Sequence, residues 1–431
     1  MSEEKANGFQ YQETLQQLID GLHREGRYRV FANLKRKVGT FPEVTFQGEE
    51  DSRQVVVWCS NDYLGMGHHS NVLQAMHESL DSSGAGSGGT RNIAGNHETI
   101  VELEAELASL HDKEAALAFS SGYVANVTAL STLARSLPGC VVFSDSENHA
   151  SMIQGIRGSK AEKYIFEHND LAHLERLLKS VSPERPKIIA FESVYSMSGD
   201  FGPIEAICDL ANEYNALTYL DETHGVGLYG HKGGGYAQAC GLTDRVDVIQ
   251  GGLGKGYGVV GGFVTGSSLL IDVIRSFGTG FIFTTSLPPV IAAGALASIR
   301  HLQESSEERD LHQRNARELK HMLAEVGLPI LQTESHIIPL MVRNSGTCKA
   351  VTDYLLEHED IYIQPINYPT VPAGTERLRI TPTPLHTKAH MESLREALLR
   401  AWSEFGLPLN PLDEPNTLQD GKIVSGQHVI S

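Results

Sequence analysis

Five short apolar runs through the middle of the chain constrain the fold more than any other feature of the sequence. They are Cys140–Asp145, Lys187–Glu192, Leu217–Asp221, Val246–Gln250 and Gly262–Gly266. Segments long enough for a crossover helix separate most of these runs, and parallel neighbours in a sheet require such crossovers. The sequence therefore predicts an α/β fold, in which a central, mostly parallel sheet is covered by helices on both faces.

The rest of the chain predicts a division into domains. Apolar residues at helical spacing, such as Ile100, Leu103 and Leu107, belong to a large domain that we place at 66–301. A charged, helix-compatible stretch over about 302–326 leads into strands near 337–342 and 377–381, and we interpret 302–410 as a smaller α+β domain. Residues 1–65 form an N-terminal segment. The stretch 411–431, which has few large apolar residues, is expected to be a flexible tail.

Charge and composition argue against several classes of partner. The net charge of −18 argues against nucleic acid as a main partner. Apolar stretches such as 337–342 are far shorter than the ~20 residues that a membrane-spanning helix needs. Residues 1–7 are polar, so we expect no targeting segment. The cysteines lack C-x-x-C spacing, which predicts free thiols in a reducing cytoplasm and no metal site. They are Cys59, Cys140, Cys208, Cys240 and Cys348.

Polar residues follow the predicted strands in succession. In α/β sheets, ligands gather at the carboxyl ends of the strands. We therefore expect an acid, two imidazoles, hydroxyl groups and a lysine to converge on one edge of the sheet. In strand order, the residues are Ser144, Asp145, Asn148 and His149, then Glu192, Ser193 and Ser196, then Asp221 and His224, and finally Lys255.

Lys255 lies in a glycine-rich string, GGLGKGYG at 251–258. The glycines allow a tight turn and give a bulky ligand access to the amine, which suits a Schiff base with an aldehyde cofactor. Alone, such a string is more often a surface turn with a solvated lysine. Asp221 ends an apolar strand three residues before His224, and a protonated pyridine nitrogen is a suitable partner for a buried carboxylate. The alternative for Asp221 is an acid that caps a turn. His149 could stack on a planar ring, and the alternative for it is an ordinary histidine in a loop.

Two nucleotide-binding motifs lack their structural context. A Walker loop needs Ser or Thr after Gly-Lys, where this chain has Gly256. The G-x-G-x-x-G strings at 84–89 and 256–261 lack the strand–turn–helix setting. The first follows a helix-like stretch, and the second precedes a strand.

Several long strings, in the right order from about Tyr11 to Leu407, resemble the α-oxoamine synthases, which are fold-type I pyridoxal-phosphate enzymes. The strings are EGRYRVF at Glu25–Phe31, WCSNDYLGMG at Trp58–Gly67, GAGSGGTRNIAG at Gly84–Gly95, NHASMIQGIR at Asn148–Arg157, FESVYSMSGDFGPI at Phe191–Ile204, GFIFTTSLPP at Gly280–Pro289 and QPINYPTVPAGTERLRITPTP at Gln364–Pro384.

The resemblance implies a homodimer with shared active sites and pyridoxal 5'-phosphate as the cofactor. Lys255 would hold the cofactor and act as the base at the amino-acid α-carbon. Asp221 would pair with the pyridine nitrogen, and His149 would stack on the ring. Ser196 and His224 would contact its phenolic oxygen. Either His149 or His224 would assist catalysis by polarising the new carbonyl.

The remaining implied roles concern the phosphate and the substrates. Gly122 and Tyr123 would hold the phosphate at a helix start, with Thr285 reaching across from the other subunit. Arg379 would bind the amino-acid carboxylate, because a planar guanidinium matches it bidentately, and Asn61 would line the same site.

Specificity is implied by a second group of residues. Thr90 stands where relatives that use larger amino acids tend to carry serine. The extra methyl group of threonine would leave room for glycine only. Arg29, Asn92 and Thr370 match residues expected around a succinyl carboxylate, and Ile93 would also bind the substrate. The implied reaction is the decarboxylative condensation of glycine with succinyl-CoA to 5-aminolevulinate, CoA and CO2, a source of tetrapyrroles including heme. The alternatives are a relative that joins another amino acid to another acyl thioester, and a cofactor-binding protein without turnover.

The chain departs from the family pattern at four positions near the implied site. Gly252 replaces threonine, which removes one hydroxyl expected near the cofactor phosphate. Thr223 replaces valine, and Gly225 and Gly256 replace alanine.

Overall fold

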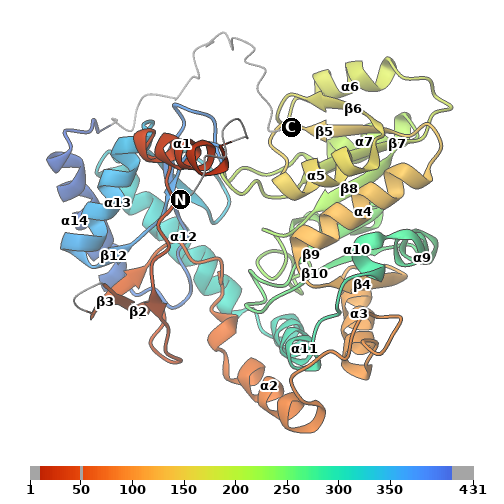
Figure 1. The fold of residues 1–431 in the computed structure, drawn as a ribbon, viewed down its shortest axis with the longest axis horizontal. Coiled ribbons are helices and arrows are strands. Elements are labelled where there is room, and N and C mark those ends of the chain that lie inside the picture. Colours follow the sequence, from red (N-terminus) through yellow and green to blue (C-terminus); the bar gives the residue numbers. More distant parts are fainter. Residues whose placement is uncertain (1–9, 49–51, 410–431) are drawn as a thin grey trace, which may run out of the picture.

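The computed structural model describes residues 10–48 and 52–409, and its largest sheet, which has seven strands, lies on one side of the molecule (Figure 1). The strand order is β4-β10-β9-β8-β7-β5-β6, and within this sheet only β10 runs antiparallel to its neighbours. All five predicted strands are present, which confirms the α/β prediction. The strands are β4 (Ala115–Phe119), β5 (Val141–Asp145), β6 (Glu162–Phe166), β7 (Lys187–Glu192), β8 (Leu217–Asp221), β9 (Val248–Gly252) and β10 (Gly262–Gly266).

Helices cover both faces of this sheet because its strands alternate their side chains between apolar cores on the two faces. Val142 and Val264 pack against α4, α5 and α9, whereas Phe143, Ile189 and Leu220 pack against α6 and α7 on the other face. The helices of this part are α2 (Ser70–Ser83), α3 (Glu98–Leu110), α4 (Gly122–Ser136), α5 (Ala150–Ser159), α6 (Leu171–Lys179), α7 (Ile204–Glu213), α8 (Tyr236–Ala239), α9 (Ser268–Phe277), α10 (Thr279–Ile282) and α11 (Pro289–Glu304).

The predicted helix around Ile100 is confirmed as α3. Ile100, Leu103 and Leu107 are fully buried, so the apolar stripe is the face that α3 turns to the core. The ring Nδ1 of His97 accepts a hydrogen bond from the backbone N–H of Ile100 and caps the helix start. Local spacing and a local cap are therefore enough to explain this element.

A smaller α+β part follows, as predicted. It contains a three-stranded antiparallel sheet in the order β11-β14-β13. The predicted helical stretch over 302–326 is two helices rather than one, because α11 ends at Glu304 and α12 begins at Glu307. The elements are α12 (Glu307–Glu325), β11 (Ile338–Met341), α13 (Ser345–Glu359), β13 (Pro365–Ile366), β14 (Arg377–Ile380) and α14 (Lys388–Glu404).

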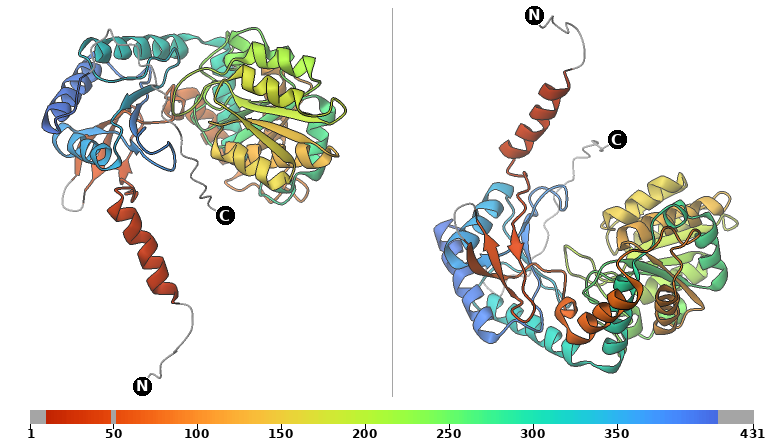
Figure 2. Two further views of the ribbon diagram at one scale, coloured as in Figure 1. Left: turned by 90° about the horizontal axis from the view of Figure 1, so that it is seen from above. Right: turned by 60° about the horizontal axis from the view of Figure 1, so that its bottom comes forward.

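The N-terminal strands join this smaller part, although the large sheet lies between them in the sequence (Figure 1). In a four-stranded sheet, β3 pairs in parallel with β12, and Val56 is opposite Ile361. The helix α1 (Tyr11–Arg24) has no buried residue and extends away from the rest of the chain (Figure 2). The strands are β1 (Leu34–Lys35), β2 (Glu43–Gln47), β3 (Ser52–Val57) and β12 (Ile361–Tyr362).

Two further predictions concern the C-terminal tail and membrane-spanning helices. The tail predicted at 411–431 lies outside the described residues. Within 10–48 and 52–409, none of the helices combines the length and the apolar character needed to cross a membrane.

Candidate active site

A cavity of about 300 Å³ lies at the carboxyl ends of β7, β8 and β9, where the strand-end rule predicts a site. It brings together eight of the predicted residues: Asn61, Gly122, Tyr123, His149, Glu192, Asp221, His224 and Lys255. A larger cavity, of about 760 Å³, lies near the opposite ends of β7 and β8 and contains none of the predicted residues. We therefore place the site at the smaller cavity.

Asp221 ends β8 and is 4% exposed. Its carboxylate accepts hydrogen bonds from Asn126 Nδ2 at 2.7 Å and from the backbone N–H of Thr223 at 2.8 Å. None of the ion pairs found in the described residues includes Asp221. A buried carboxylate with two neutral donors has room for a cationic one, and a protonated pyridine nitrogen fits that need.

Lys255 follows β9, in the turn of the glycine-rich string. Burial lowers the pKa of Lys255 to about 8, so part of the amine is neutral and nucleophilic near neutral pH. The turn needs glycine at 258, where φ is +70° and a Cβ would lie 2.2 Å from the backbone nitrogen of Gly67. The string therefore forms a tight turn, as predicted, and presents the amine to the cavity.

The two predicted histidines lie in different surroundings. His224 is buried, and its Nδ1 is 2.9 Å from the hydroxyl of Tyr63, which leaves Nε2 for the cavity. Burial lowers the pKa of His224 well below its ordinary value, so the ring is neutral. His149 is exposed at the start of α5, and its Nδ1 accepts from the backbone N–H of Ser151. An exposed ring at the cavity is available for stacking.

The start of α4 offers donors for a phosphate. Ser121 caps this helix, because its Oγ accepts from the backbone N–H of Val124 at 3.1 Å. The N–H groups of Gly122 and Tyr123 lie in the first turn, where no intrahelical acceptor exists, and both residues line the cavity. A helix N-terminus of this kind suits an anion, so the donor set fits pyridoxal phosphate as a whole.

A guanidinium reaches the site from the smaller part of the chain. Arg379 is 8% exposed on β14, and its Nη2 donates a short hydrogen bond to Asn61 Oδ1. Its Nη1 donates to the backbone oxygen of Ser196 at 3.4 Å. Ser196, predicted at the phenolic oxygen, does not line the cavity. Its backbone carbonyl oxygen instead accepts the hydrogen bond from Arg379.

The remaining predicted residues lie elsewhere in the chain. Thr90 and Thr285 form an isolated bridge with each other, and neither lines the Lys255 cavity. Asn92 and Ile93 follow Thr90 in the same turn and are exposed.

Arg29 and Thr370 do meet, as the resemblance implies. Arg29 Nη2 is 3.4 Å from Thr370 Oγ1, and both residues line a separate cavity of about 680 Å³.

Sequence reasoning missed Asn126. Its amide donates to Asp221 and to Ser151, and its Oδ1 accepts from the hydroxyl of Tyr219 at 2.9 Å. The signal that could have found it is a buried amide within an otherwise apolar helix face, since Ala125, Ala129 and Leu130 surround it in the sequence.

At two of the departures from the family pattern, neighbouring side chains fill the space that a Cβ atom would need. A Cβ on Gly252 would lie 2.8 Å from Thr223 Cγ2, so the threonine at 223 occupies the space that a side chain at 252 would need. At Gly225, a Cβ would lie 2.0 Å from Glu222 Oε2.

Comparisons with known proteins place this site in context. The family model of class I and II aminotransferases matches residues 53–398. The chain is 56% identical over 398 residues to 5-aminolevulinate synthase 2 of Cereibacter sphaeroides, covering 92% of this chain and 98% of that one. It is 57% identical over 389 residues to 5-aminolevulinate synthase of Rhizobium meliloti, covering 90% and 96%. A structure of serine palmitoyltransferase from S. paucimobilis, solved with PLP and myriocin bound, has a TM-score of 0.84 at 30% identity and covers 91% of this chain and 98% of that one.

Proposed function

We infer the function of this site from one premise: the chain belongs to the 5-aminolevulinate synthase family, within the class I and II aminotransferases. It is a pyridoxal-phosphate-dependent acyltransferase, which condenses glycine with succinyl-CoA and releases 5-aminolevulinate, CoA and CO2 for tetrapyrrole and heme biosynthesis. When bound, pyridoxal phosphate supplies the electron sink for negative charge at the glycine α-carbon. One observation supports this placement of the chemistry above all others: the buried carboxylate of Asp221 and the amine of Lys255 line the same cavity.

We propose the following roles for the residues of the chain. Lys255 anchors the cofactor and then moves the α-proton of glycine, for which a pKa of about 8 is well suited. Asp221 holds a proton on the pyridine nitrogen, and Asn126 fixes the carboxylate in place. His149 stacks on the ring. Neutral His224, oriented by Tyr63, faces the phenolic oxygen.

The amino-acid substrate is bound by its carboxylate. We propose that Arg379 and Asn61 bind this group, because the guanidinium is buried, lies close to the Lys255 cavity and keeps donors available for a planar anion. We propose that Arg29 and Thr370 bind the carboxylate of the succinyl group. Their cavity is large and carries a cation at its wall, as a charged acyl chain requires.

The active site is proposed to need two copies of the chain. Tyr123 and Val260 line the cavity although they are 49% and 55% exposed. Apolar side chains are also exposed beside Thr90 and Thr285, since Ile93 is 80% and Phe283 77% exposed. Exposed apolar groups at both places suit contact between subunits. In the proposed homodimer, the partner supplies Thr90, Asn92, Ile93 and Thr285.

Subunit mixing tests the shared site. Lys255→Ala combined with Asn92→Ala under subunit exchange is expected to regain activity, because one site in each heterodimer would be intact. Random pairing predicts a recovery of about a quarter of the wild-type rate.

The matched control pairs Lys255→Ala with Arg379→Ala. Both residues are proposed to act from one chain, so no heterodimer would contain an intact site. Recovery in the control, absence of recovery in the test pair, or a monomeric mass in sedimentation would each contradict the shared-site model.

A substrate panel tests the specificity. Glycine, alanine and serine are each combined with succinyl-, acetyl- and palmitoyl-CoA, and the products are identified by mass spectrometry. The expected product is 5-aminolevulinate from glycine and succinyl-CoA. Arg29→Leu is expected to lower kcat/KM for succinyl-CoA by about 100-fold, because it removes the proposed carboxylate partner, while glycine affinity stays unchanged. A preference for serine with palmitoyl-CoA would instead favour another branch of the α-oxoamine synthases.

The proposal also covers the domain boundaries and the cellular location of the enzyme. We propose a large domain at 66–301 and a small one at 302–410, with Arg379 of the small domain reaching the cavity of the large one. We also propose a cytoplasmic enzyme, because all five cysteines are free and three of them are buried thiols.

A further inference from the structure

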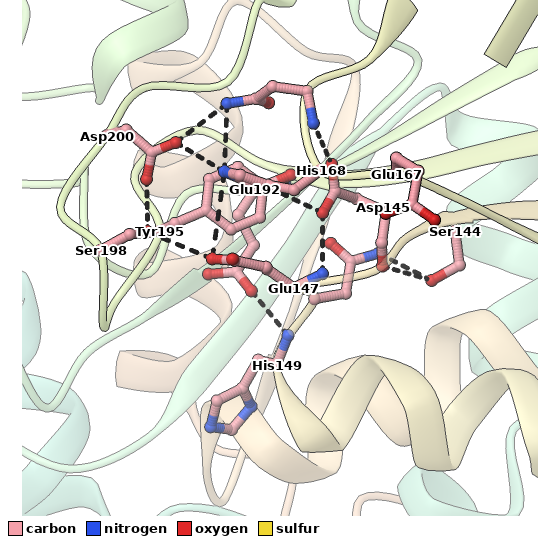
Figure 3. Close-up of polar contacts among 12 residues, drawn as sticks. Ser144, Asp145, Glu147, His149, Glu167, His168, Glu192, Tyr195, Ser198 and Asp200 are labelled. Atoms are coloured by element: carbon pink, nitrogen blue, oxygen red, sulfur yellow. Dashed lines mark hydrogen bonds and ion pairs between the residues drawn. The ribbon is translucent and has the colours of Figure 1, made fainter. Parts of the chain in front are cut away.

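A charged cluster outside the cavity joins three segments of the large domain (Figure 3). His168 follows β6, Asp145 ends β5, and Asp200 belongs to the loop after β7. His168 Nδ1 is 2.9 Å from Asp145 Oδ1, and its Nε2 is 2.5 Å from Asp200 Oδ2. We call these three residues the imidazolium clamp.

The charge state of the clamp follows from its contacts. Burial lowers the pKa of His168, but hydrogen bonds to Asp145 and Asp200 raise it to about 10 overall. Both ring nitrogens are therefore donors near neutral pH. Neither nitrogen then has a lone pair for a metal ion, so the cluster is better described as a bridge between two carboxylates.

Each end of the clamp is held by further contacts. The carboxylate of Asp145 accepts from the backbone N–H groups of Glu147 and Asn169 at 2.8 and 3.0 Å. Asp200 accepts from Asn169 Nδ2 at 3.0 Å and from the hydroxyl of Ser198. The clamp therefore ties the loop at 193–202 to the carboxyl end of β5.

The loop at 193–202 is a tight return of the backbone. Its N–H groups at Tyr195 and Gly202 donate to the carbonyl oxygens of Asp200 and Ser193. Gly199 has a φ of +78°, and a Cβ there would lie 3.2 Å from Ile337 of the small domain. The tip of the loop thus packs directly against the small domain.

The carbonyl groups at this tip hold two buried arginines. Arg379 Nη1 donates to the oxygen of Ser196 at 3.4 Å, and Arg377 Nη1 donates to the oxygen of Met197 at 3.0 Å. Arg379 is 8% and Arg377 7% exposed. A continuous path of contacts therefore runs from the clamp, through one short loop, to the guanidinium at the edge of the active site.

We propose that His168 is a positioning residue for Arg379, through which the imidazolium clamp sets the affinity of the site for the carboxylate of the amino-acid substrate. This inference rests on the proposed role of Arg379. Loss of the imidazolium leaves two carboxylates facing each other without a cation, and the loop relaxes. Arg379 then loses the Ser196 carbonyl, and its guanidinium is no longer held in the orientation that a bidentate carboxylate needs.

The test measures glycine binding to the holoenzyme by its absorbance change, without thioester, together with steady-state kinetics. His168→Gln is expected to raise the Kd and the KM for glycine about tenfold, with kcat changed less than about threefold. The KM for succinyl-CoA is expected to stay unchanged. The matched control is His173→Gln, at a histidine near the start of α6 whose Nδ1 accepts from the backbone N–H of Glu167, and it should bind glycine as the wild type does. If His168→Gln is poorly folded, Asp200→Asn makes the same measurement from the other side of the clamp.

Coupling to Arg379 separates positioning from a merely structural effect. In an Arg379→Lys background, His168→Gln is expected to change glycine affinity less than about twofold, because the group it positions is already altered. A full tenfold loss in that background would overturn the proposal. If Arg379→Lys weakens glycine binding but neither His168→Gln nor Asp200→Asn does, the clamp has no such role. If Arg379→Lys itself binds glycine normally, the proposed function of Arg379 fails and the inference fails with it.

Discussion

Replacing Lys255 with alanine is expected to abolish steady-state formation of 5-aminolevulinate, with kcat lowered by at least about 10⁴-fold. The variant loses the amine that we propose anchors the cofactor and moves the glycine α-proton, and no other amine lines the cavity within the described residues. The measurement is product formation from glycine and succinyl-CoA at saturating concentrations of both.

The fold of this variant should stay intact. Lys255 lies in a turn at the cavity, and its removal leaves the strands on either side and their apolar cores unchanged. Lys232→Ala, at an exposed lysine in another glycine-rich turn, is the matched control and should keep its activity. Activity of Lys255→Ala within tenfold of that control would refute the central assignment.

Replacing Asp221 with asparagine is expected to slow the exchange of the glycine α-proton by roughly 100- to 1000-fold. The amide has the same shape as the carboxylate, but it carries no charge with which to keep the pyridine nitrogen protonated. Exchange is measured in deuterated water with glycine alone, so that steps involving the thioester do not contribute.

A second aspartate provides the control for this experiment. Asp247 also accepts two neutral hydrogen bonds, from the backbone N–H and the hydroxyl of Thr218, but near the opposite end of β8. Asp247→Asn is expected to leave the exchange rate unchanged. Near-normal exchange in Asp221→Asn would show that another group holds the pyridine nitrogen.

The strands and the residues at their ends were predictable because both depend on neighbours in the sequence. A run such as Lys187–Glu192 is apolar at every position between its ends, which is typical of a strand buried on both faces. Since parallel strands end at a common edge, Asp221 and Lys255 were expected to meet before any contact was known. The two strands of the large sheet that were not predicted, β4 and β6, are its edge strands.

Contacts between distant segments were not predictable in the same way. Asn126 and Asp221 are 95 positions apart, and Arg379 and Ser196 are 183 apart. Each pair depends on how a helix or a domain packs against the sheet. A periodic pattern indicates which face of an element is buried, but it does not identify the residue that the face will meet.

By itself, the sequence determined the α/β sheet and the edge of the sheet at which Lys255 and Asp221 meet. Strand periodicity, strand ends and a glycine-rich turn are local properties, so they can be read from short stretches of chain. Only the tertiary structure decided that β3 pairs with β12, that Thr90 meets Thr285 away from the cavity, and that His168 bridges Asp145 and Asp200 beside the loop that contacts Arg379. These arrangements join segments far apart in the chain, and their register is set by the packing of whole domains, which no local pattern specifies.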